Sequence, residues 1–514
     1  MIDYKQTKAP KTTITRDLNE LTEKVGNVYE TVAIIGKRSN QISAALKKEL
    51  DSKLQDFSVP QDSIDETFEN KEQIEISRSY EQLPKATLIA TQEFIDDELI
   101  SRSGNKDEVL KSLSLSGKHI LVGISGGIAA YKIPELIRLL KKAGADVQVA
   151  TTKNALEFVT SLTLQTVSGH KVYSDVFAAI NEHSTEHISL PDWADLMIVA
   201  PATANVLCKM ANGIADDALT TTFAAMRKPV VIAPAMNTNM YDSPATQKAI
   251  NELAQWENIT MLDAASGALA CGTSGKGRMQ EVETIVAAAE YALTPKTLQG
   301  QQVLITAGPT QEAIDPVRYI SNASTGKMGY ALARACLKRG AKVTLVTGPT
   351  HLSLHAWQAF TPLTIVPVVS AQAMCQAAIS AFEKADISIL CAAVADFTPT
   401  QTAEYKIKKQ AGQTHMTIEM SCTTDIAATL GRQKRAGQTL VGFALETHDE
   451  LNNAQRKLQS KNLDMIVLNS LQDAGAGFGT DTNKVTLLFP NGTQKNLPLI
   501  AKEEVADEII NQLN

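Results

Sequence analysis

A single cysteine lies among glycines in LACGTSGKGRM, residues 269–279, and three kinds of function would suit this stretch. Glycines before Lys276 are typical of loops that bind phosphate, Cys271 could act as a reactive thiol, and a plain surface turn would contain the same residues. The phosphate loop fits poorly, because GTSGKG lacks the full G-x-x-x-x-G-K-[S/T] spacing. From the residues alone, a thiol with a chemical role and a structural turn both remain open.

A second glycine-rich stretch, VGISGGIAAYK, joins an apolar run to an amphipathic one and contains Gly123, Ser125, Gly126 and Gly127. Backbone amides between a strand and a helix can bind a phosphate, and Ser125 would add a hydroxyl donor. The pattern is not G-x-G-x-x-G, and no acidic residue ends the next strand to bind a ribose. A mononucleotide such as FMN therefore fits better than a dinucleotide, and a turn without a ligand remains the alternative.

Further polar residues flank the next apolar runs, ADLMIVAPA and PVVIAPAMN. Because ligands of open α/β sheets bind at the carboxyl ends of strands, we expect these residues to border one crevice with Cys271. They are His187, Pro201, Thr203, Asn205 and Asn237. Structural roles are the alternative: a cap for His187, a turn for Asn237 and burial for Cys271.

The elements that would position these residues form two α/β units. KHILVGISGGIAAYKIPELIRLLKKAGADVQVATT is typical of a strand, a turn, a helix and a second strand, and a similar unit starts at QQVLITAGP. We expect two doubly wound, Rossmann-like domains, one flavoprotein-type and one ligase-type, after a small mainly helical domain. The expected segments are residues 1–102 (helical), 103–116 (linker), 117–291 (first α/β), 292–301 (linker) and 302–514 (second α/β).

LKKAGADVQVAT and LKRGAKVTLVT occupy the same place in the two units. Duplication would explain this, but the generic turn from helix to strand in doubly wound folds explains it equally and is favoured. In the second unit we expect strands at DISILCAAVAD, TLVGFALE and DMIVLNS, a hairpin around FPNGTQ, and a last helix in AKEEVADEIINQLN.

Composition bounds the function classes. The chain has 514 residues, 44% of them hydrophobic and 20% charged, with no apolar run long enough to cross a bilayer and a polar N-terminal segment unlike a signal peptide. Six scattered cysteines form no C-x-x-C pair or metal-ligand cluster. A net charge of −7 argues against broad nucleic-acid binding. We expect a cytoplasmic protein without a membrane association, with free thiols and no protein-bound metal.

In order and spacing, GISGGIAAYK, APATAN, PAMN and ACGxxGxGRM resemble the flavin-dependent cysteine decarboxylases over residues 117–290. The resemblance extends to phosphopantothenoylcysteine decarboxylases, which form the first half of a bifunctional family of coenzyme A biosynthesis. It implies that FMN oxidises the substrate thiol, so that a C=S bond accepts the electrons released with CO2. It also implies that Cys271 lies on a flap and protonates the intermediate, that His187 is a base and that Asn237 binds the substrate carboxylate. The glycines beside Cys271 would let the flap open and close.

AGPTQEAIDPVRYISNASTGKMGYALA has Ser321 where a P-loop needs its first glycine, and Met328 after Gly326 and Lys327. The string instead resembles DPVRxISNxSSGxMG of the phosphopantothenate-cysteine ligases, with Thr325 replacing the second serine. AAVADF, KIKK and GFALET follow in that family's order, and the resemblance covers residues 301–514.

The ligase resemblance implies that CTP and Mg²⁺ activate 4'-phosphopantothenate as an acyl-cytidylate, from which cysteine displaces CMP. Lys406 would serve the first step and Asn322 the acyl-cytidylate and its conversion. The expected CTP-binding residues are Gly326, Lys327, Met328, Asp396, Lys406, Lys409 and Phe443. A solvated basic loop is the alternative interpretation of KIKKQ, and the choice of CTP over ATP depends on the resemblance alone.

Residues 1–102 resemble a different family. TITRDLNELTEKVGNVYETVAIIGKRSNQIS resembles the omega subunit of bacterial RNA polymerase, and LPKATLIATQEF continues a longer variant. The matching residues are Gly26, Asn27, Tyr29, Glu30, Lys37, Arg38 and Gln41. An omega-like segment would bind the largest polymerase subunit, whereas an unrelated helical appendage is the alternative.

Together the motifs predict a bifunctional enzyme that converts 4'-phosphopantothenate, L-cysteine and CTP to 4'-phosphopantetheine. We expect a homo-oligomer, because flavin sites in the resembling family lie between subunits. The alternative function is an omega-type polymerase-binding subunit with an appended flavoprotein module.

Overall fold

The fold is described from a computed structural model of the chain. It describes residues 7, 9–10, 12, 28–55, 77–96, 114–177, 186–268, 274–409, 414–446, 448–470, 477 and 479–513. By its internal contacts the chain divides into two units, Met1–Ser103 and Gly104–Asn514, which are considered separately.

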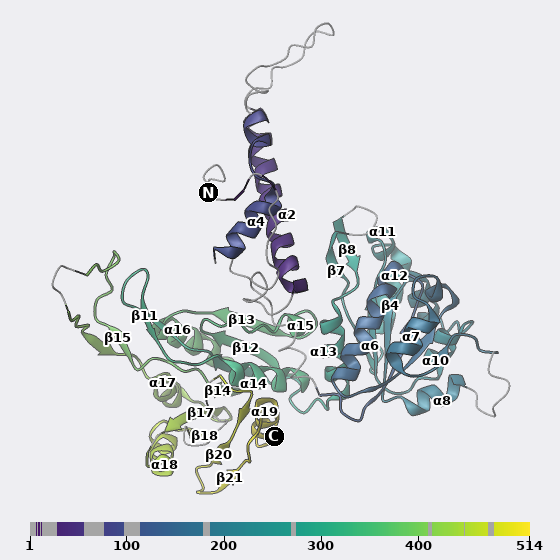
Figure 1. Cartoon of the computed structure of the whole chain (residues 1–514). Helices are drawn as coiled ribbons and strands as arrows, with labels where there is room; N and C mark the ends of the chain where they lie inside the picture. The colour runs from purple at the N-terminus through teal and green to yellow at the C-terminus, as the bar shows by residue number, and fades with distance from the viewer. Residues whose placement is uncertain are drawn as a thin grey trace. The chain divides into compact units, whose positions relative to one another are not determined.

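The first unit is helical in its described part. α2 (Val28–Gln55) packs against α4 (Ala86–Ile95), and Ile42, Ile89 and Ala90 are buried between them (Figure 1). The Arg38 guanidinium binds the Glu93 carboxylate through Nε at 2.7 Å and Nη2 at 3.1 Å. Such a two-fold contact fixes the register of the two helices. Of the other omega-pattern residues, Gly26 and Asn27 lie outside the described residues, and so do the side chains of Tyr29, Glu30 and Lys37.

The second unit contains a six-stranded parallel sheet in the order β3-β2-β1-β4-β5-β6. This is the strand order of a doubly wound Rossmann-like fold, as predicted. Its strands are β1 (His119–Ile124), β2 (Asp146–Thr151), β3 (Val172–Tyr173), β4 (Leu196–Ala202), β5 (Val230–Pro234) and β6 (Ile259–Met261).

Alternate residues of these strands enter two different cores. Ile120 and Val122 pack with α6 (Ile133–Lys142), α7 (Ser161–Ser168) and α13 (Val282–Leu293), whereas Leu121 faces the other side of the sheet. That side is covered by α8 (Glu186–Trp193), α9 (Ala204–Ala211), α10 (Ala218–Ala225) and α12 (Pro244–Ala254). The strands are apolar on both faces because helices cover both faces.

Two local features differ from the simplest expectation. The chain after β1 forms a short 3₁₀ turn, η2 (Ile128–Lys132), before α6 begins. The stretch around Cys271 belongs to an antiparallel hairpin, β7 (Ala265–Ala268) and β8 (Ser274–Arg278), and residues 269–273 lie outside the described residues.

A second sheet of eight strands has the order β13-β12-β9-β14-β17-β18-β20-β21, in which β20 and β21 are antiparallel (Figure 1). Its strands are β9 (Gln302–Ala307), β12 (Lys342–Thr347), β13 (Leu363–Pro367), β14 (Ile387–Leu390), β17 (Thr439–Glu446), β18 (Met465–Ser470), β20 (Val485–Leu488) and β21 (Gln494–Asn496). The predicted strands β14, β17 and β18, the hairpin β20–β21 and the last helix α19 (Lys502–Asn511) are all confirmed.

Helices again cover both faces of this sheet. α14 (Lys327–Lys338), α15 (His355–Gln358) and α19 lie on one face, and α16 (Ala371–Phe382), α17 (Ile426–Gln433) and α18 (Glu450–Ser460) on the other. Short antiparallel pairs extend from it: β10 (Gln311–Ala313) with β11 (Tyr319–Ser321), β15 (Phe397–Pro399) with β16 (Met420–Cys422), and β19 (Thr482–Asn483) with β22 (Ile500–Ala501). Within the described parts of the chain, no helix is long and apolar enough to cross a membrane.

Candidate functional site

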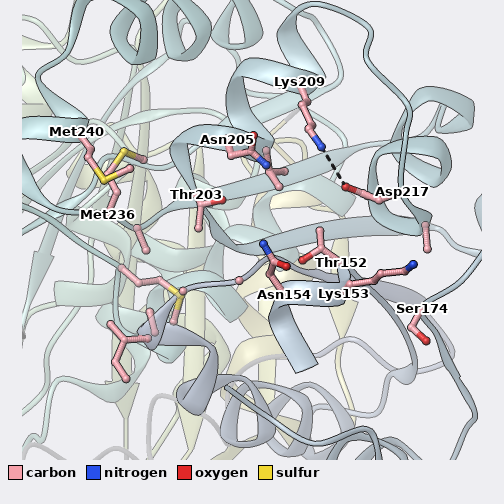
Figure 2. A pocket seen from close by; sticks show the side chains of 18 of the residues that line it. Thr152, Lys153, Asn154, Ser174, Thr203, Asn205, Lys209, Asp217, Met236 and Met240 are labelled. Carbon is pink, nitrogen blue, oxygen red and sulfur yellow. Dashed lines mark ion pairs between the residues drawn. The ribbon is translucent and has the colours of Figure 1, made fainter. Parts of the chain in front are cut away.

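A cavity of about 850 Å³ opens at the carboxyl ends of the first sheet. It is lined by the loops that follow β1, β2, β3, β4 and β5 and by the end of β8. Figure 2 shows Thr152, Asn154, Thr203, Asn205, Met236 and Met240 around it. Five of the residues singled out in the sequence line this cavity: Gly126, Gly127, Thr203, Asn205 and Asn237.

Ser125 joins the two central loops of the cavity. Its fully buried hydroxyl donates to the Pro201 carbonyl at 2.6 Å and accepts from the Thr203 amide at 3.1 Å. The one hydroxyl proton is thus used within the protein in this structure, and its donation to a phosphate stays a prediction. Instead, Ser125 and Pro201 hold the loops after β1 and β4 together. Gly123 is similarly structural, because a Cβ there would lie 2.3 Å from Leu219 Cδ1.

The Gly126–Gly127 bend has the properties of an anion cradle. A Cβ on Gly126 would lie 2.9 Å from the Asn154 carbonyl oxygen, so only glycine lets these loops approach. Thr152 Oγ1 is buried without a hydrogen-bond partner among the described residues. A buried hydroxyl without a partner is costly in a folded protein, and a bound phosphate would satisfy it. The bend therefore fits the phosphate of a mononucleotide.

Asn237 lies three residues after the end of β5 and caps α11 (Thr238–Tyr241), where its side-chain oxygen accepts from the Asn239 amide at 2.8 Å. His187 is half-buried in the first turn of α8 and is not among the residues that line the cavity. Cys271 lies outside the described residues. The structure therefore places Asn237 at the cavity, and the roles of all three residues stay predictions.

A charged cluster in this cavity was not identified from the sequence. Lys209 Nζ lies 2.7 Å from Asp216 Oδ1 and 3.7 Å from Asp217 Oδ2, and all three residues line the cavity (Figure 2). The hydrogen bond to Asp216 raises the pKa of Lys209, and the same contact lowers the pKa of Asp216. The residues belong to CKMANGIADD, in which one cation and two carboxylates lie close in sequence. That proximity was the only available signal.

A second cavity, of about 510 Å³, opens beside the other sheet. Its lining includes six of the residues expected at the ligase site: Asn322, Gly326, Lys327, Met328, Asp396 and Phe443. Asn322 reaches across the cavity loops, because its Nδ2 donates to the carbonyls of Ala393 at 3.1 Å and Val394 at 3.0 Å. The ISN and AAVAD motifs therefore meet at one place.

Lys406 and Lys409 are exposed and are not among the lining residues. Their segment is instead attached to the β10–β11 hairpin through Ile407, whose amide donates to Asp315 at 3.1 Å and whose carbonyl accepts from Arg318 at 2.7 Å. The Arg318 guanidinium and three backbone amides hold the pKa of the buried Asp315 carboxyl well below its ordinary value. The DPVR motif thus anchors the KIKK motif.

Three more lysines line the second cavity: Lys457, Lys461 and Lys502. Lys457 in α18 and Lys461 at its C-terminal cap lie on the same side of the helix, because they are four residues apart. The sequence could have revealed this spacing. Lys502 is 5% exposed and donates to the carbonyls of Gly477 at 3.0 Å and Thr480 at 2.6 Å. Burial, and then the nearby Lys327, lower the pKa of Lys502. Several lysines therefore border the cavity, of which Lys457 pairs with Glu446 at 2.7 Å and Lys461 with Asp425 at 2.9 Å.

Among the described residues, no group of three His, Cys, Asp or Glu side chains is placed to hold a metal ion.

Three family models match successive parts of the chain. They are RNA polymerase Rpb6 at residues 20–74, Flavoprotein at residues 109–293, and DNA/pantothenate metabolism flavoprotein C-terminal domain at residues 298–514. The Flavoprotein match and the C-terminal-domain match meet between residues 293 and 298, whereas the Rpb6 match ends at residue 74.

Whole-length relatives cover both α/β regions. The chain is 49% identical over 402 residues to the coenzyme A biosynthesis bifunctional protein CoaBC of Bacillus subtilis, a match that covers 78% of this chain and 97% of that protein. The protein of that name from Escherichia coli is 43% identical over 403 residues, with 78% and 98% covered. The crystal structure of the C-terminal domain of a protein CoaBC is 41% identical, covers 42% of this chain and 96% of that one, and gives a TM-score of 0.35.

Proposed function

The chain belongs to the family of bifunctional coenzyme A biosynthesis proteins, and on that premise we propose how its two cavities divide the family's ligase and decarboxylase reactions. Residues 117–291 would decarboxylate and residues 302–514 would ligate, with residues 103–116 and 292–301 as linkers. The observation that carries this division is that each cavity is lined by one motif set, GISGGIAAYK with PAMN in the first and ISN with AAVAD in the second.

In the first cavity, the Gly126–Gly127 bend and Thr152 would hold the phosphate of FMN, with Thr203 and Asn205 beside it. When bound, FMN supplies an electron acceptor and donor for the substrate thiol, which makes loss of CO2 possible. Asn237 would donate from its amide nitrogen to the substrate carboxylate and so orient the bond that breaks. His187 would remove a proton from the substrate, and Cys271 would return one to carbon after CO2 has left.

In the second cavity, Lys327 at the start of α14 and the cluster of Lys457, Lys461 and Lys502 would surround the triphosphate of CTP. Gly326 and Met328 would contribute main-chain amides, and Phe443 and Asp396 would border the cytidine. Asn322 would bind the acyl-cytidylate, because it already contacts the AAVAD segment. Mg²⁺ would enter with CTP, because the described residues offer no metal cluster of their own.

Lys406 and Lys409 need a further step in this proposal, because both are outside the cavity lining. Either the KIKK segment moves toward the nucleotide, or a second copy of the chain supplies it. A homo-oligomer of this enzyme is therefore part of the proposal.

We also propose that residues 1–102 bind the largest subunit of RNA polymerase. The match to RNA polymerase Rpb6 at residues 20–74 supports this second role, and the Arg38–Glu93 pair shows how the described helices are held in register. The alternative in which the α/β part is an incidental flavoprotein module is not favoured, because enzyme relatives cover that whole part.

The proposed function is tested with the purified protein. It should show the visible absorbance of bound flavin. Over several turnovers, it should release pyrophosphate only when CTP, 4'-phosphopantothenate and cysteine are all present. A folded, colourless protein that cannot be loaded with FMN would contradict the decarboxylase assignment, and pyrophosphate release independent of 4'-phosphopantothenate would contradict the ligase assignment.

A further inference from the structure

The β7–β8 hairpin contacts the turn that carries Asn237. The Met236 amide donates to the Gly277 carbonyl of β8 at 2.8 Å, and the preceding amide, of Ala235, donates to the Ala202 carbonyl at 2.9 Å. The backbone immediately before Asn237 is therefore held on one side by the end of β4 and on the other by β8. Asn237 itself caps α11 through its side-chain oxygen, so its orientation follows from this backbone.

This contact requires glycine at two positions of β8. A Cβ on Gly277 would lie 2.3 Å from the Met236 carbonyl oxygen, and a Cβ on Gly275 would lie 2.5 Å from Thr238 Oγ1. Both distances are far shorter than van der Waals contact, and the atom opposed to Gly277 is backbone, which cannot rotate away. Any side chain at either position would push β8 away from residues 236–238.

Gly267, in the neighbouring strand β7, could carry a Cβ without meeting residues 236–238. It pairs with Gly275 across the hairpin and has a φ of +159°, close to the +148° of Gly277. A Cβ on Gly267 would come no closer than 3.6 Å to Arg278 Nη1, which is ordinary contact. Gly267 and Gly277 therefore have a similar φ, but only Gly277 meets the Asn237 turn.

We propose that Gly275 and Gly277 are positioning residues for Asn237. By leaving no side chain between β8 and residues 236–238, they hold the turn that presents Asn237 to the substrate carboxylate. This role differs from the flap hinge expected from the sequence, because the contact fixes β8 instead of freeing it. The inference depends on the proposed role of Asn237 in decarboxylation.

The test uses the full-length flavin-loaded protein with phosphopantothenoylcysteine as substrate. Gly275→Ala should lower kcat/KM for CO2 release by about ten- to a hundredfold, since displacement of a substrate-positioning group by about 1 Å has effects of that size. Flavin content should stay unchanged, because the Gly126–Gly127 cradle is separate. Adding Thr238→Ala should restore kcat/KM to within about threefold of the Thr238→Ala single variant, because it removes the atoms that the new methyl group meets.

Gly267→Ala is the control for backbone strain in the hairpin. Alanine is strained at its φ of +159°, but the methyl group meets only ordinary contacts and none with residues 236–238, so kcat/KM should stay within about threefold of the parent value. Equal losses in Gly267→Ala and Gly275→Ala, or no restoration in the double variant, would overturn the inference.

Hydrogen exchange gives a readout that does not depend on the reaction. The Met236 amide should exchange about tenfold faster in Gly277→Ala and in Gly275→Ala than in the parent protein, because its acceptor is displaced. Unchanged exchange in both variants would refute the docking itself. If exchange changes as expected but the parent protein does not decarboxylate, the proposed function fails and the docking stands. If the parent is active and exchange changes but kcat/KM does not, the positioning role fails.

Discussion

Within one motif, some residues are placed to contact a ligand, whereas others hold those residues in place. In the first cavity, Gly126, Gly127 and Asn237 face the space where a ligand would bind, whereas Ser125 and Pro201 bond to each other. In the second, Asn322 borders the cavity, whereas Asp315 and Arg318 of the preceding DPVR motif anchor Ile407. A motif therefore identifies a site without assigning each of its residues to chemistry.

Two substitutions should separate the half-reactions. Cys271→Ser should retain FMN and still release CO2 but should accumulate the oxidised enethiol, because a hydroxyl is a far weaker acid than a thiol with a pKa of about 8.5. Asn322→Asp should impair the ligase and leave decarboxylation of supplied phosphopantothenoylcysteine intact. Both reactions are measured by mass spectrometry in each variant. Phosphopantetheine formation at the parent rate by Cys271→Ser, or loss of decarboxylation in Asn322→Asp, would show that the roles are misassigned.

Asp315 should make stability depend on pH in a defined window. The Arg318 guanidinium lowers its pKa in the folded chain, so the carboxylate stabilises the fold fully above the unfolded-chain pKa of about 3.9. This stabilisation is lost as the pH falls from there through the lowered folded-state pKa. The difference in unfolding free energy between the parent and Asp315→Asn should thus be constant from about pH 5 to 8 and shrink below about pH 4. Urea denaturation at each pH measures it, and a difference that grows in acid would contradict the ion pair.

At the scale of elements, the strand order of each sheet decides which loops can form a site. β1 lies between β2 and β4 in the first sheet, so the loops after β1 and β4 run side by side and Ser125 can bridge them. The sequence pattern was sufficient to predict these elements, since the strands at the apolar runs and the final helix lie where the pattern places them.

The details that the sequence could not supply are contacts between segments distant in the chain. Ser125 reads as a phosphate donor in SGG, but its partner lies 76 residues later. Lys502 lies in an ordinary amphipathic helix and reaches the second cavity only because α19 packs on α14. The sequence around Cys271 also does not show that the Gly277 carbonyl accepts from the Met236 amide, 41 residues earlier in the chain. Local patterns determine elements, whereas pairings across the sheet depend on the complete fold.

Removal of the Ser125 bridge should loosen the first cavity without unfolding the sheet. Ser125→Ala leaves the Thr203 amide without this acceptor and leaves the buried Pro201 carbonyl with only the residue-125 amide, at 3.3 Å, as donor, at a cost of about 1–3 kcal/mol. FMN affinity should fall by about tenfold or more, as judged by titration of the flavin-free protein, while ligase activity remains at the parent level. Ser161→Ala in α7 is a matched control, because among the described residues its hydroxyl accepts only from the nearby Gln165 side chain. Equal FMN affinity in Ser125→Ala and the control would contradict a bridging role.

For the whole molecule, the contact pattern separates residues 1–103 from the part that contains both cavities. A chain that begins at residue 104 should therefore carry out both half-reactions within about twofold of the parent rates, and it should lose any binding to RNA polymerase. Steady-state assays and co-purification with polymerase, each compared with the full-length chain, measure these outcomes. A loss of flavin or of ligase activity in the shortened chain would show that the first unit supports the enzyme.

The most direct measurement is the balance of products from the full-length, flavin-loaded protein given 4'-phosphopantothenate, L-cysteine and CTP. We expect one 4'-phosphopantetheine, one CO2, one CMP and one pyrophosphate per cysteine consumed, and no CO2 when CTP is omitted. A folded protein with bound flavin that forms CMP and pyrophosphate but no phosphopantetheine, even when phosphopantothenoylcysteine is supplied, would contradict the assignment of the two cavities to one pathway.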